Sequence, residues 1–442
     1  MRTLSGLFAT ALLMIAVARS GAQVKAPAVD PNTVNAMKKL GAVLVSFDVN
    51  EKSAIEIEKF DGAAGRFSVF QFATIDDKVL AKLPKTDAVI GIDLHFPRTG
   101  TAAKKDTVSE AGLKFLGNLK NLQMLSVAGR RGFGNEELKE IFGCKELRFL
   151  DLSGTGISVE GLRMIDQLKE LRALDVSRTR AASDEGIRDL GLAKELRTLN
   201  LEGSRGVTDT GLKDLAPLKK LFSLNIARTK VSDVGLAELT KFDQLRYLIL
   251  SDTEIGDDGI KQLAPLTKLE RIDLQGTRIS DDGLKDLTKL SGLLHLNLEN
   301  TRITDEGLKN IPEFGLLAKL NLAKDRVTDA GLAEVAKNKA LKSLNLEQTR
   351  VTDAGLKELA GLPLDELTLD GLAITDAGIK ELLKLPLTQL SLKNTQISDF
   401  GLKELARIKS LTHVNVTGCK KVTKTGIASV KFQLPKAVFD GP

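Results

Sequence analysis

Apolar and polar residues follow one pattern that recurs every 23 to 25 residues from Leu122 onward. In one copy, Leu293, Leu296 and Leu298 stand among polar residues with the alternation of a short, half-buried strand. Leu308 and Ile311 then follow with the three-residue spacing of one helical face. Each copy is therefore predicted to form a short strand followed by a short helix.

Thirteen regular copies follow one another, and a looser copy begins near Val89. The regular copies begin at Leu122, Leu147, Leu171, Leu196, Leu221, Leu245, Leu269, Leu293, Leu317, Leu341, Leu364, Leu387 and Leu411. A fixed period of this length is typical of a solenoid, in which each copy buries its apolar face against its neighbours. Parallel strands stack about 4.8 Å apart, whereas helices pack about 8–10 Å apart. We therefore expect an α/β solenoid of about 14 repeats, with a curved, concave parallel β-sheet and short helices on the convex side.

Two columns of small residues mark the turns of the repeat. When the first leucine is position 1, position 9 holds Thr or Ser in most copies, and its hydroxyl can satisfy backbone groups in the bend. Asp325 and Leu372 interrupt this column, so looser bends are expected there. A glycine such as Gly283 follows the start of nearly every helix, although glycine is costly inside a helix. Its recurrence predicts close packing between adjacent turns.

The full phrase, L-x-x-L-x-L-x-x-T-x-I-T/S-D-x-G-L-x-x-L, resembles the cysteine-containing subclass of leucine-rich repeats, with Thr in place of Cys. The resemblance covers about residues 89 to 435. That subclass occurs in secreted bacterial proteins and in the substrate receptors known as F-box proteins. The resemblance implies the fold of that subclass, because the shared residues are the ones that build the solenoid.

The regions outside the repeat divide into three parts. Residues 1–22 resemble a signal peptide, with Arg2 before an apolar stretch and a cleavage site after Ala22; a retained membrane anchor is the alternative. Residues 23–86 are predicted to form a helix from Asp30, a hairpin that pairs residues 43–47 with residues 55–57, and a strand over 67–72 that caps the solenoid. The solenoid then spans residues 87–435 and a tail spans 436–442. Residues 95–106 interrupt one copy, either as a binding edge or as a tolerated loop.

Composition and motifs argue against several classes of function. Lys and Arg exceed Asp and Glu by 64 to 58, a net charge of +6, which does not indicate nucleic-acid binding. The two cysteines, Cys144 and Cys419, lie about eleven repeats apart, so both are predicted to be free thiols. The three histidines fall in widely separated copies, where surface positions are expected, and no catalytic motif is found. We therefore expect a monomer without enzymatic activity, cofactor or metal.

Two charged columns run along the solenoid. Position 10 is basic in most copies, for example at Arg278 and Arg302, and an Asp such as Asp281 or Asp305 stands at the helix start. One hypothesis is a basic rim that binds an acidic ligand. The other is that each Arg lies near an Asp of its own or the next copy, in a solvated ladder of weak ion pairs.

The concave face is the predicted binding surface. Positions 3, 5 and 7 of each strand project from it, and position 5 forms a polar stripe of Asp and Asn that either binds a ligand or is polar because the face is solvated. Tyr and Arg dominate the energetics of protein interfaces. The candidate binding residues are Phe222, Arg246, Tyr247, Arg271 and His295. We expect an exported protein, secreted or periplasmic, that binds a protein partner on this face; the alternative is an adaptor that resembles F-box substrate receptors.

Overall fold

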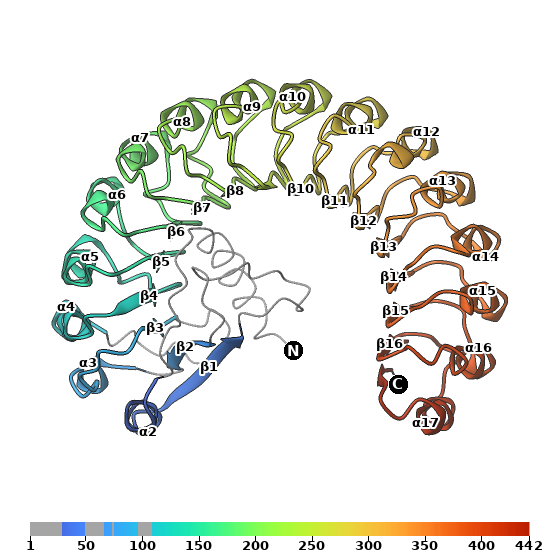
Figure 1. Ribbon diagram of the computed structural model, residues 1–442, viewed down its shortest axis with the longest axis horizontal. Coiled ribbons are helices and arrows are strands. Elements are labelled where there is room, and N and C mark those ends of the chain that lie inside the picture. Colours follow the sequence, from blue (N-terminus) through green and yellow to red (C-terminus); the bar gives the residue numbers. More distant parts are fainter. Residues whose placement is uncertain (1–28, 49–65, 73–74, 96–107, 442) are drawn as a thin grey trace. The chain divides into compact units, whose positions relative to one another are not determined.

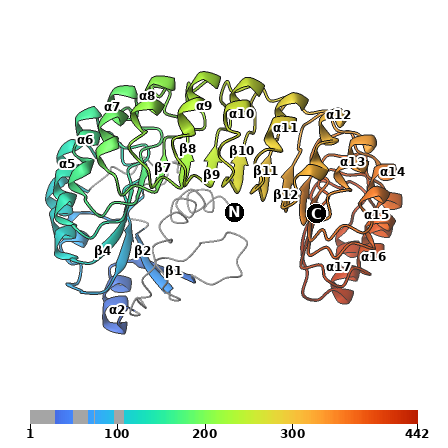
Figure 2. The ribbon, with the colours of Figure 1, turned by 45° about the horizontal axis from the view of Figure 1, so that its top comes forward.

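The computed structural model describes residues 29–48, 66–72, 75–95 and 108–441. The chain divides into two compact units, Met1–Val231 with Lys241–Leu245 (unit 1) and Ser232–Thr240 with Arg246–Pro442 (unit 2). Within each unit the strands lie on the inner side and the helices on the outer side (Figure 1, Figure 2). This arrangement of parallel strands, each followed by a short helix, confirms the predicted solenoid.

Unit 1 begins with an antiparallel strand pair, after which the strands are parallel. Its strands are β1 (Ala42–Asp48), β2 (Arg66–Phe72), β3 (Ile90–Asp93), β4 (Leu122–Ser126), β5 (Phe149–Asp151), β6 (Ala173–Asp175), β7 (Thr198–Asn200) and β8 (Ser223–Asn225). β2 pairs with β1 on one side and with β3 on the other, so the segment predicted as a strand over 67–72 begins the parallel sheet. Residues 55–57, the predicted hairpin partners of β1, lie outside the described residues, as do residues 96–107 of the interrupted copy.

The outer side of unit 1 carries short helices. They are α2 (Pro31–Lys39), α3 (Asp77–Leu80), α4 (Glu110–Leu113), α5 (Asn135–Glu140), α6 (Val159–Arg163), α7 (Asp184–Arg188) and α8 (Asp209–Asp214). Single 3-10 turns accompany them at η2 (Lys114–Asn118), η3 (Ile141–Gly143), η4 (Ile165–Gln167) and η5 (Asp189–Leu192). α2 begins where the sequence predicts, because the Asp30 carboxylate accepts a hydrogen bond from the Thr33 N–H (2.9 Å) and caps the helix.

Unit 2 repeats the same strand and helix without interruption. Its strands are β9 (Tyr247–Ile249), β10 (Arg271–Asp273), β11 (His295–Asn297), β12 (Lys319–Asn321), β13 (Ser343–Asn345), β14 (Glu366–Thr368), β15 (Gln389–Ser391), β16 (His413–Asn415) and β17 (Val438–Asp440). Its helices are α9 (Asp233–Leu239), α10 (Asp257–Gln262), α11 (Asp281–Leu287), α12 (Asp305–Leu308), α13 (Asp329–Val335), α14 (Asp353–Leu356), α15 (Asp376–Leu382), α16 (Asp399–Leu405) and α17 (Lys424–Gln433), with 3-10 turns η6 (Ile311–Glu313) and η7 (Lys357–Leu359). The core lies between the two layers, where Leu293, Leu296 and Leu298 are at most 2% exposed.

The Asp at the start of a helix is bonded to the next copy. Asp257 accepts hydrogen bonds from the Ser280 N–H (2.8 Å) and the Ser280 hydroxyl (2.5 Å), and a Cβ added at Gly283 would collide with its carboxylate. The same contact recurs between Asp184 and Thr208, Asp281 and Thr304, Asp305 and Thr328, Asp329 and Thr352, Asp353 and Thr375, Asp376 and Ser398, and Asp399 and Thr423. The predicted packing role of the glycine column is therefore confirmed.

Position 9 satisfies the backbone as predicted. The Thr277 hydroxyl donates to the Leu274 carbonyl (2.6 Å), and in the last copy the Cys419 thiol donates to the Leu392 carbonyl (3.0 Å). Asp325 does not loosen its bend, contrary to the prediction. Its carboxylate accepts hydrogen bonds from the Thr301 N–H (2.8 Å) and hydroxyl (3.0 Å), so it joins two copies. Cys144 and Cys419 are both buried free thiols.

Candidate binding surface

The position-3 residues of unit 2 form one row on the inner face of the sheet, which we call the position-3 row. Register places Tyr247 beside Arg271, Arg271 beside His295, and His295 beside Lys319. The central residue of each strand is buried toward the helices, whereas its two neighbours are half-buried on the other face. The row continues through Ser343, Glu366, Gln389 and His413. Three of the five predicted binding residues, Tyr247, Arg271 and His295, are therefore neighbours in it.

Next to Tyr247 in the row, three adjacent strands carry the basic side chains of Arg271, His295 and Lys319, which we call the cationic cluster. Lys319 Nζ lies 3.3 Å from Glu366 Oε2, two strands away. Burial, followed by the positive charges of Arg271 and Lys319, lowers the pKa of His295 to about 4. At neutral pH the His295 imidazole is therefore uncharged between two cations. Its side chain is half-buried on the inner face of the sheet.

Tyr247 and Arg246 converge on one carboxylate. Arg246 forms an ion pair with Glu270, and the Tyr247 hydroxyl donates to Glu270 Oε2 (3.4 Å). The Arg246 side chain is only 26% exposed. Arg246 therefore holds Glu270 and positions the tyrosine at the end of the cationic cluster. Glu270, the partner of Arg246, could not be identified from spacing alone.

Phe222 does not join this surface. It precedes β8 in unit 1, and only 8% of it is exposed. A side chain this deeply buried stabilises the unit and offers little area to a partner. The structure therefore does not support Phe222 as an exposed anchor.

The position-5 stripe has a structural role that neither sequence hypothesis included. Asp273 accepts a hydrogen bond from the Gln275 N–H (3.1 Å), and Asn297 accepts one from the Glu299 N–H (3.0 Å). The Asn297 amide also donates to Asp273 (3.0 Å), which links the two strands. Asp and Asn recur at this position because their short side chains reach the backbone two residues on.

The predicted ladder of Arg and Asp is wrong in unit 2. Among the described residues of that unit no ion pair joins the two columns, because the Asp carboxylates are bonded to Ser and Thr of the next copy. Arg278 instead lies 3.5 Å from Glu254, and both side chains are more than half exposed. Such an exposed pair contributes little.

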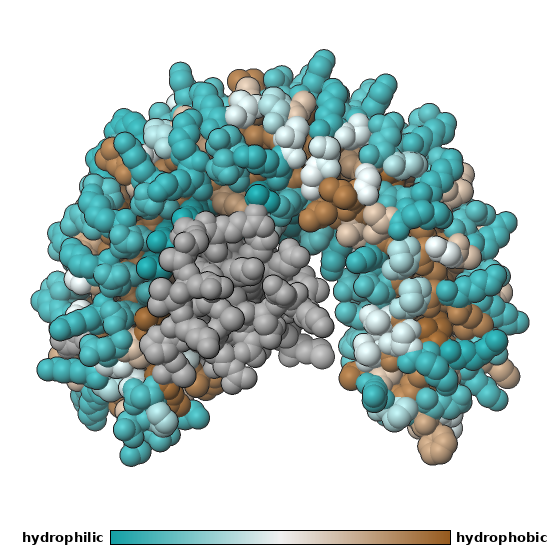
Figure 3. Space-filling view, in the orientation of Figure 1, coloured by the Kyte–Doolittle hydropathy of each residue, from teal (hydrophilic) through white to brown (hydrophobic). Residues whose placement is uncertain are grey.

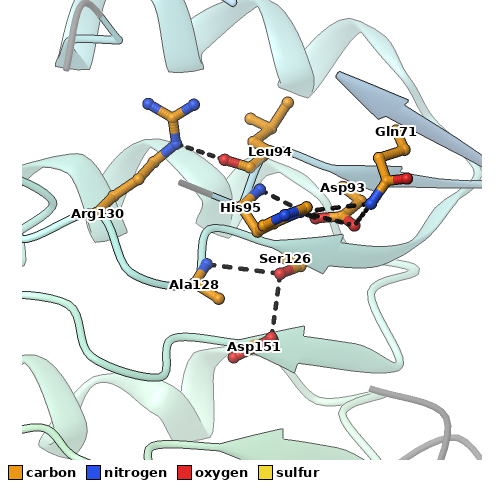
Figure 4. Close-up of polar contacts among 8 residues, drawn as sticks. All are labelled: Gln71, Asp93, Leu94, His95, Ser126, Ala128, Arg130 and Asp151. Carbon is orange, nitrogen blue, oxygen red and sulfur yellow. Dashed lines mark hydrogen bonds and ion pairs between the residues drawn. The ribbon is translucent and has the colours of Figure 1, made fainter. Parts of the chain in front are cut away.

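Unit 1 carries a second polar cluster at the carboxyl ends of β2, β3, β4 and β5 (Figure 4). Gln71 donates to Asp93 (3.0 Å), His95 Nδ1 lies 3.1 Å from the same carboxylate, and Ser126 donates to Asp151 (3.0 Å). The hydrogen bond to Asp93 raises the pKa of His95. Asp151 and Asp175 are almost fully buried and paired in register.

Burial determines the protonation of these carboxyl groups. It raises the pKa of Asp151, and burial followed by the charge of Asp151 raises the pKa of Asp175 to about 7. Asp175 is held by the Ser177 N–H (2.8 Å) and the Asn200 amide (2.8 Å). Because Asp93, Asp151 and Asp175 are all buried, this cluster affects stability more directly than binding.

The face shown in Figure 3 is mainly hydrophilic over the helices, with scattered apolar residues. Exposed apolar side chains such as Val234, Leu316, Phe400 and Phe432 belong to different elements or turns. Among the described residues no helix has the length and apolar character needed to span a membrane. In the same part of the chain, no group of three or more His, Cys, Asp or Glu side chains could hold a metal ion.

A family model described as a leucine-rich repeat region matches residues 107–441. Among solved structures, an internalin from Listeria monocytogenes is 24% identical, with a TM-score of 0.53 over 77% of this chain and 91% of that one. A leucine-rich repeat protein from Leptospira interrogans is 20% identical, with a TM-score of 0.48 over 84% of this chain and 93% of that one. TLR13, solved in complex with ssRNA13, is 18% identical, with a TM-score of 0.50 over 80% of this chain and 57% of that one. No curated protein matches the chain.

Proposed function

The chain belongs to the leucine-rich repeat family, and from that premise we propose that the inner face of unit 2 binds a protein partner. Proteins built from these repeats are typically non-enzymatic scaffolds that bind through an extended sheet surface. The observation that carries the proposal is the register of Tyr247, Arg271 and His295 on one face. Aromatic and Arg side chains that share a surface are the usual anchors of protein interfaces.

The chemistry of the position-3 row supports binding and not catalysis. Its titratable groups stand one per strand, and the neighbours of His295 in the row are the cations Arg271 and Lys319, so no adjacent carboxylate orients it as a base. The F-box-like adaptor is not proposed, because it calls for a separate helical module before the repeats. In the described residues of that region α2 packs beside β1, and β1 pairs with β2 of the parallel sheet.

Substitution of Tyr247 by alanine is expected to weaken binding of the partner by about 2 kcal/mol or more, since a half-buried aromatic anchor is lost. Arg278→Ala is the matched control. It removes an exposed charge already near Glu254 and should cost less than about 1 kcal/mol. The partner is identified by affinity capture and mass spectrometry, and its affinity for each variant is then measured by titration. A larger loss for Arg278→Ala would place the ligand on the basic rim and contradict the choice of surface.

We also propose that the chain is exported as a mature protein that starts at Gln23. The support is the signal-like composition of residues 1–22, which lie outside the described residues. Mass spectrometry of the protein recovered outside the cytosol should find Gln23 at its amino terminus. An intact chain beginning at Met1 in the cytosolic fraction would refute the proposal.

A further inference from the structure

Three adjacent strands of unit 2 each present one basic side chain to the same face. Strands lie about 4.8 Å apart, so the outer members of the cationic cluster stand on strands about 10 Å apart. Within the described part of the chain, no carboxylate forms an ion pair with Arg271 or His295. Lys319 has one such partner, Glu366. The cluster therefore holds more positive charge than its surroundings neutralise.

The nearest acids in the sequence are already bonded to other groups. Glu270 is engaged by Arg246 and by the Tyr247 hydroxyl. Asp273 accepts hydrogen bonds from the Gln275 N–H and the Asn297 amide. A half-buried cation without a counter-charge is costly, and groups kept in such surroundings often belong to functional sites. Burial and the charges of Arg271 and Lys319 together lower the pKa of His295, so the positive charge of the cluster at neutral pH comes from Arg271 and Lys319.

We propose that Arg271, His295 and Lys319 form a site for carboxylates that takes a short acidic segment of the protein partner. This inference rests on the function proposed above and specifies the chemistry of its ligand. The planar Arg271 guanidinium can hold one carboxylate through two parallel N–H donors. Lys319 can donate to a second carboxylate one or two strands away, and a protonated His295 can donate to either. Tyr247 borders the site and offers apolar contact to the same segment.

The length of the cluster favours a peptide over a long polyanion. Beyond Lys319 the row continues with uncharged Ser343 and then with the Glu366 carboxylate. On the other side the cluster is bordered by the uncharged Tyr247 in β9. A nucleic acid or an acidic polysaccharide, charged along its whole length, would meet the Glu366 carboxylate two strands beyond Lys319. A short acidic segment, no longer than a hexapeptide, can place its carboxylates on the cluster without extending further along the row.

The test measures binding of fluorescently labelled hexaglutamate to the full chain by anisotropy at low ionic strength. Arg271→Glu and Lys319→Glu should each weaken binding at least tenfold. The matched control is Lys285→Glu, the same charge change on the exposed outer side of α11, which should alter binding less than twofold. Glu366→Gln should strengthen binding two- to fivefold because it releases Lys319, and such a gain cannot come from misfolding.

A second measurement follows the imidazole of His295 by NMR. Its charged neighbours are Arg271 on β10, Lys319 on β12 and Glu366 on β14. Bound hexaglutamate should raise the pKa of His295, so binding should strengthen as the pH falls from 7.5 to 5.5. In His295→Gln this pH dependence should be lost while binding at pH 7.5 persists.

Failure of hexaglutamate to bind, or an equal loss in Lys285→Glu, would overturn the inference. Equal binding of a heparin hexasaccharide or an oligothymidylate with the same dependence on Arg271 would overturn the assignment to a peptide. If Tyr247→Ala abolishes partner binding but hexaglutamate does not bind, the proposed function is supported and the carboxylate site is contradicted. If hexaglutamate binds the cluster but Tyr247→Ala does not change the affinity for the partner, the carboxylate site is supported and the proposed surface for the partner is contradicted.

Discussion

Gly283→Val is expected to lower the free energy of unfolding by about 3 kcal/mol. The new side chain would displace the Asp257 carboxylate and would place its Cβ 2.9 Å from Ile279 Cγ2. Overpacking of this kind costs about 1–3 kcal/mol. Loss of the Asp257 hydrogen bonds to Ser280 adds to that cost. Unfolding by urea, followed by circular dichroism, measures the change.

Gly315→Val is the control for this prediction. Gly315 belongs to the same unit, and a Cβ added there meets no atom within 4 Å. Its midpoint of unfolding should stay close to that of the unsubstituted chain. Equal destabilisation by both substitutions would show that valine acts through general backbone effects, and the turn-to-turn contact would then have no special role.

The period of the sequence predicted the layers of the fold because periodicity is a geometric property. Leu293, Leu296 and Leu298 alternate with polar residues only if one face of a strand is buried, and all three are buried. The glycine column could also be predicted, since repeated use of a costly residue requires a close contact at the same place in each copy. The match between Gly283 and Asp257 shows that contact.

Side-chain partners could not be predicted in the same way. Charge suggested that each Asp of the column forms an ion pair with an Arg of its own or the next copy. Asp281 instead accepts hydrogen bonds from Thr304, because the stacking of copies brings residues 23 positions apart into contact. The spacing places both an Arg and a Thr near each Asp, and only the direction of their side chains decides which of them bonds to it. A left-handed backbone at position 8, seen at Asn300 and Gly276, was missed although Gly and Asn are frequent there.

The sequence predicted part of the candidate site, namely the residues whose positions follow from the repeat. Register along the strands could be inferred from the repeat, so Tyr247, Arg271 and His295 were correctly expected on one face. The capture of Arg246 by Glu270 and the burial of Phe222 depend on local packing, which varies from copy to copy. Lys319 was missed because an isolated lysine at position 3 is unremarkable until its two basic neighbours are placed beside it.

The chain is expected to lose stability between pH 5 and pH 8 through groups whose pKa is raised in the folded state. The pKa of Asp175 rises from 3.8 to about 7, so between these values the folded chain holds a proton that the unfolded chain has released. The free energy of unfolding therefore falls as the pH rises through that range. Asp325, with its pKa also raised to about 7, and His95, with a raised pKa, act in the same direction.

Asp175→Asn removes the group that is expected to contribute most to the pH dependence of stability in unit 1. A pKa near 7 in place of 3.8 corresponds to at most about 4 kcal/mol, and the coupling with Asp151 divides that cost between two residues. Relative to the unsubstituted chain, the variant should gain stability at pH 8 compared with pH 5, by a few kcal/mol at most. Urea unfolding at both pH values measures this difference, and Asp87→Asn, which changes an exposed residue of the same unit, should leave it unchanged. If Asp175→Asn shifts stability equally at pH 5 and pH 8, the Asp175 carboxyl group is already ionised in the folded chain at pH 5, and Asp175 does not make stability depend on pH.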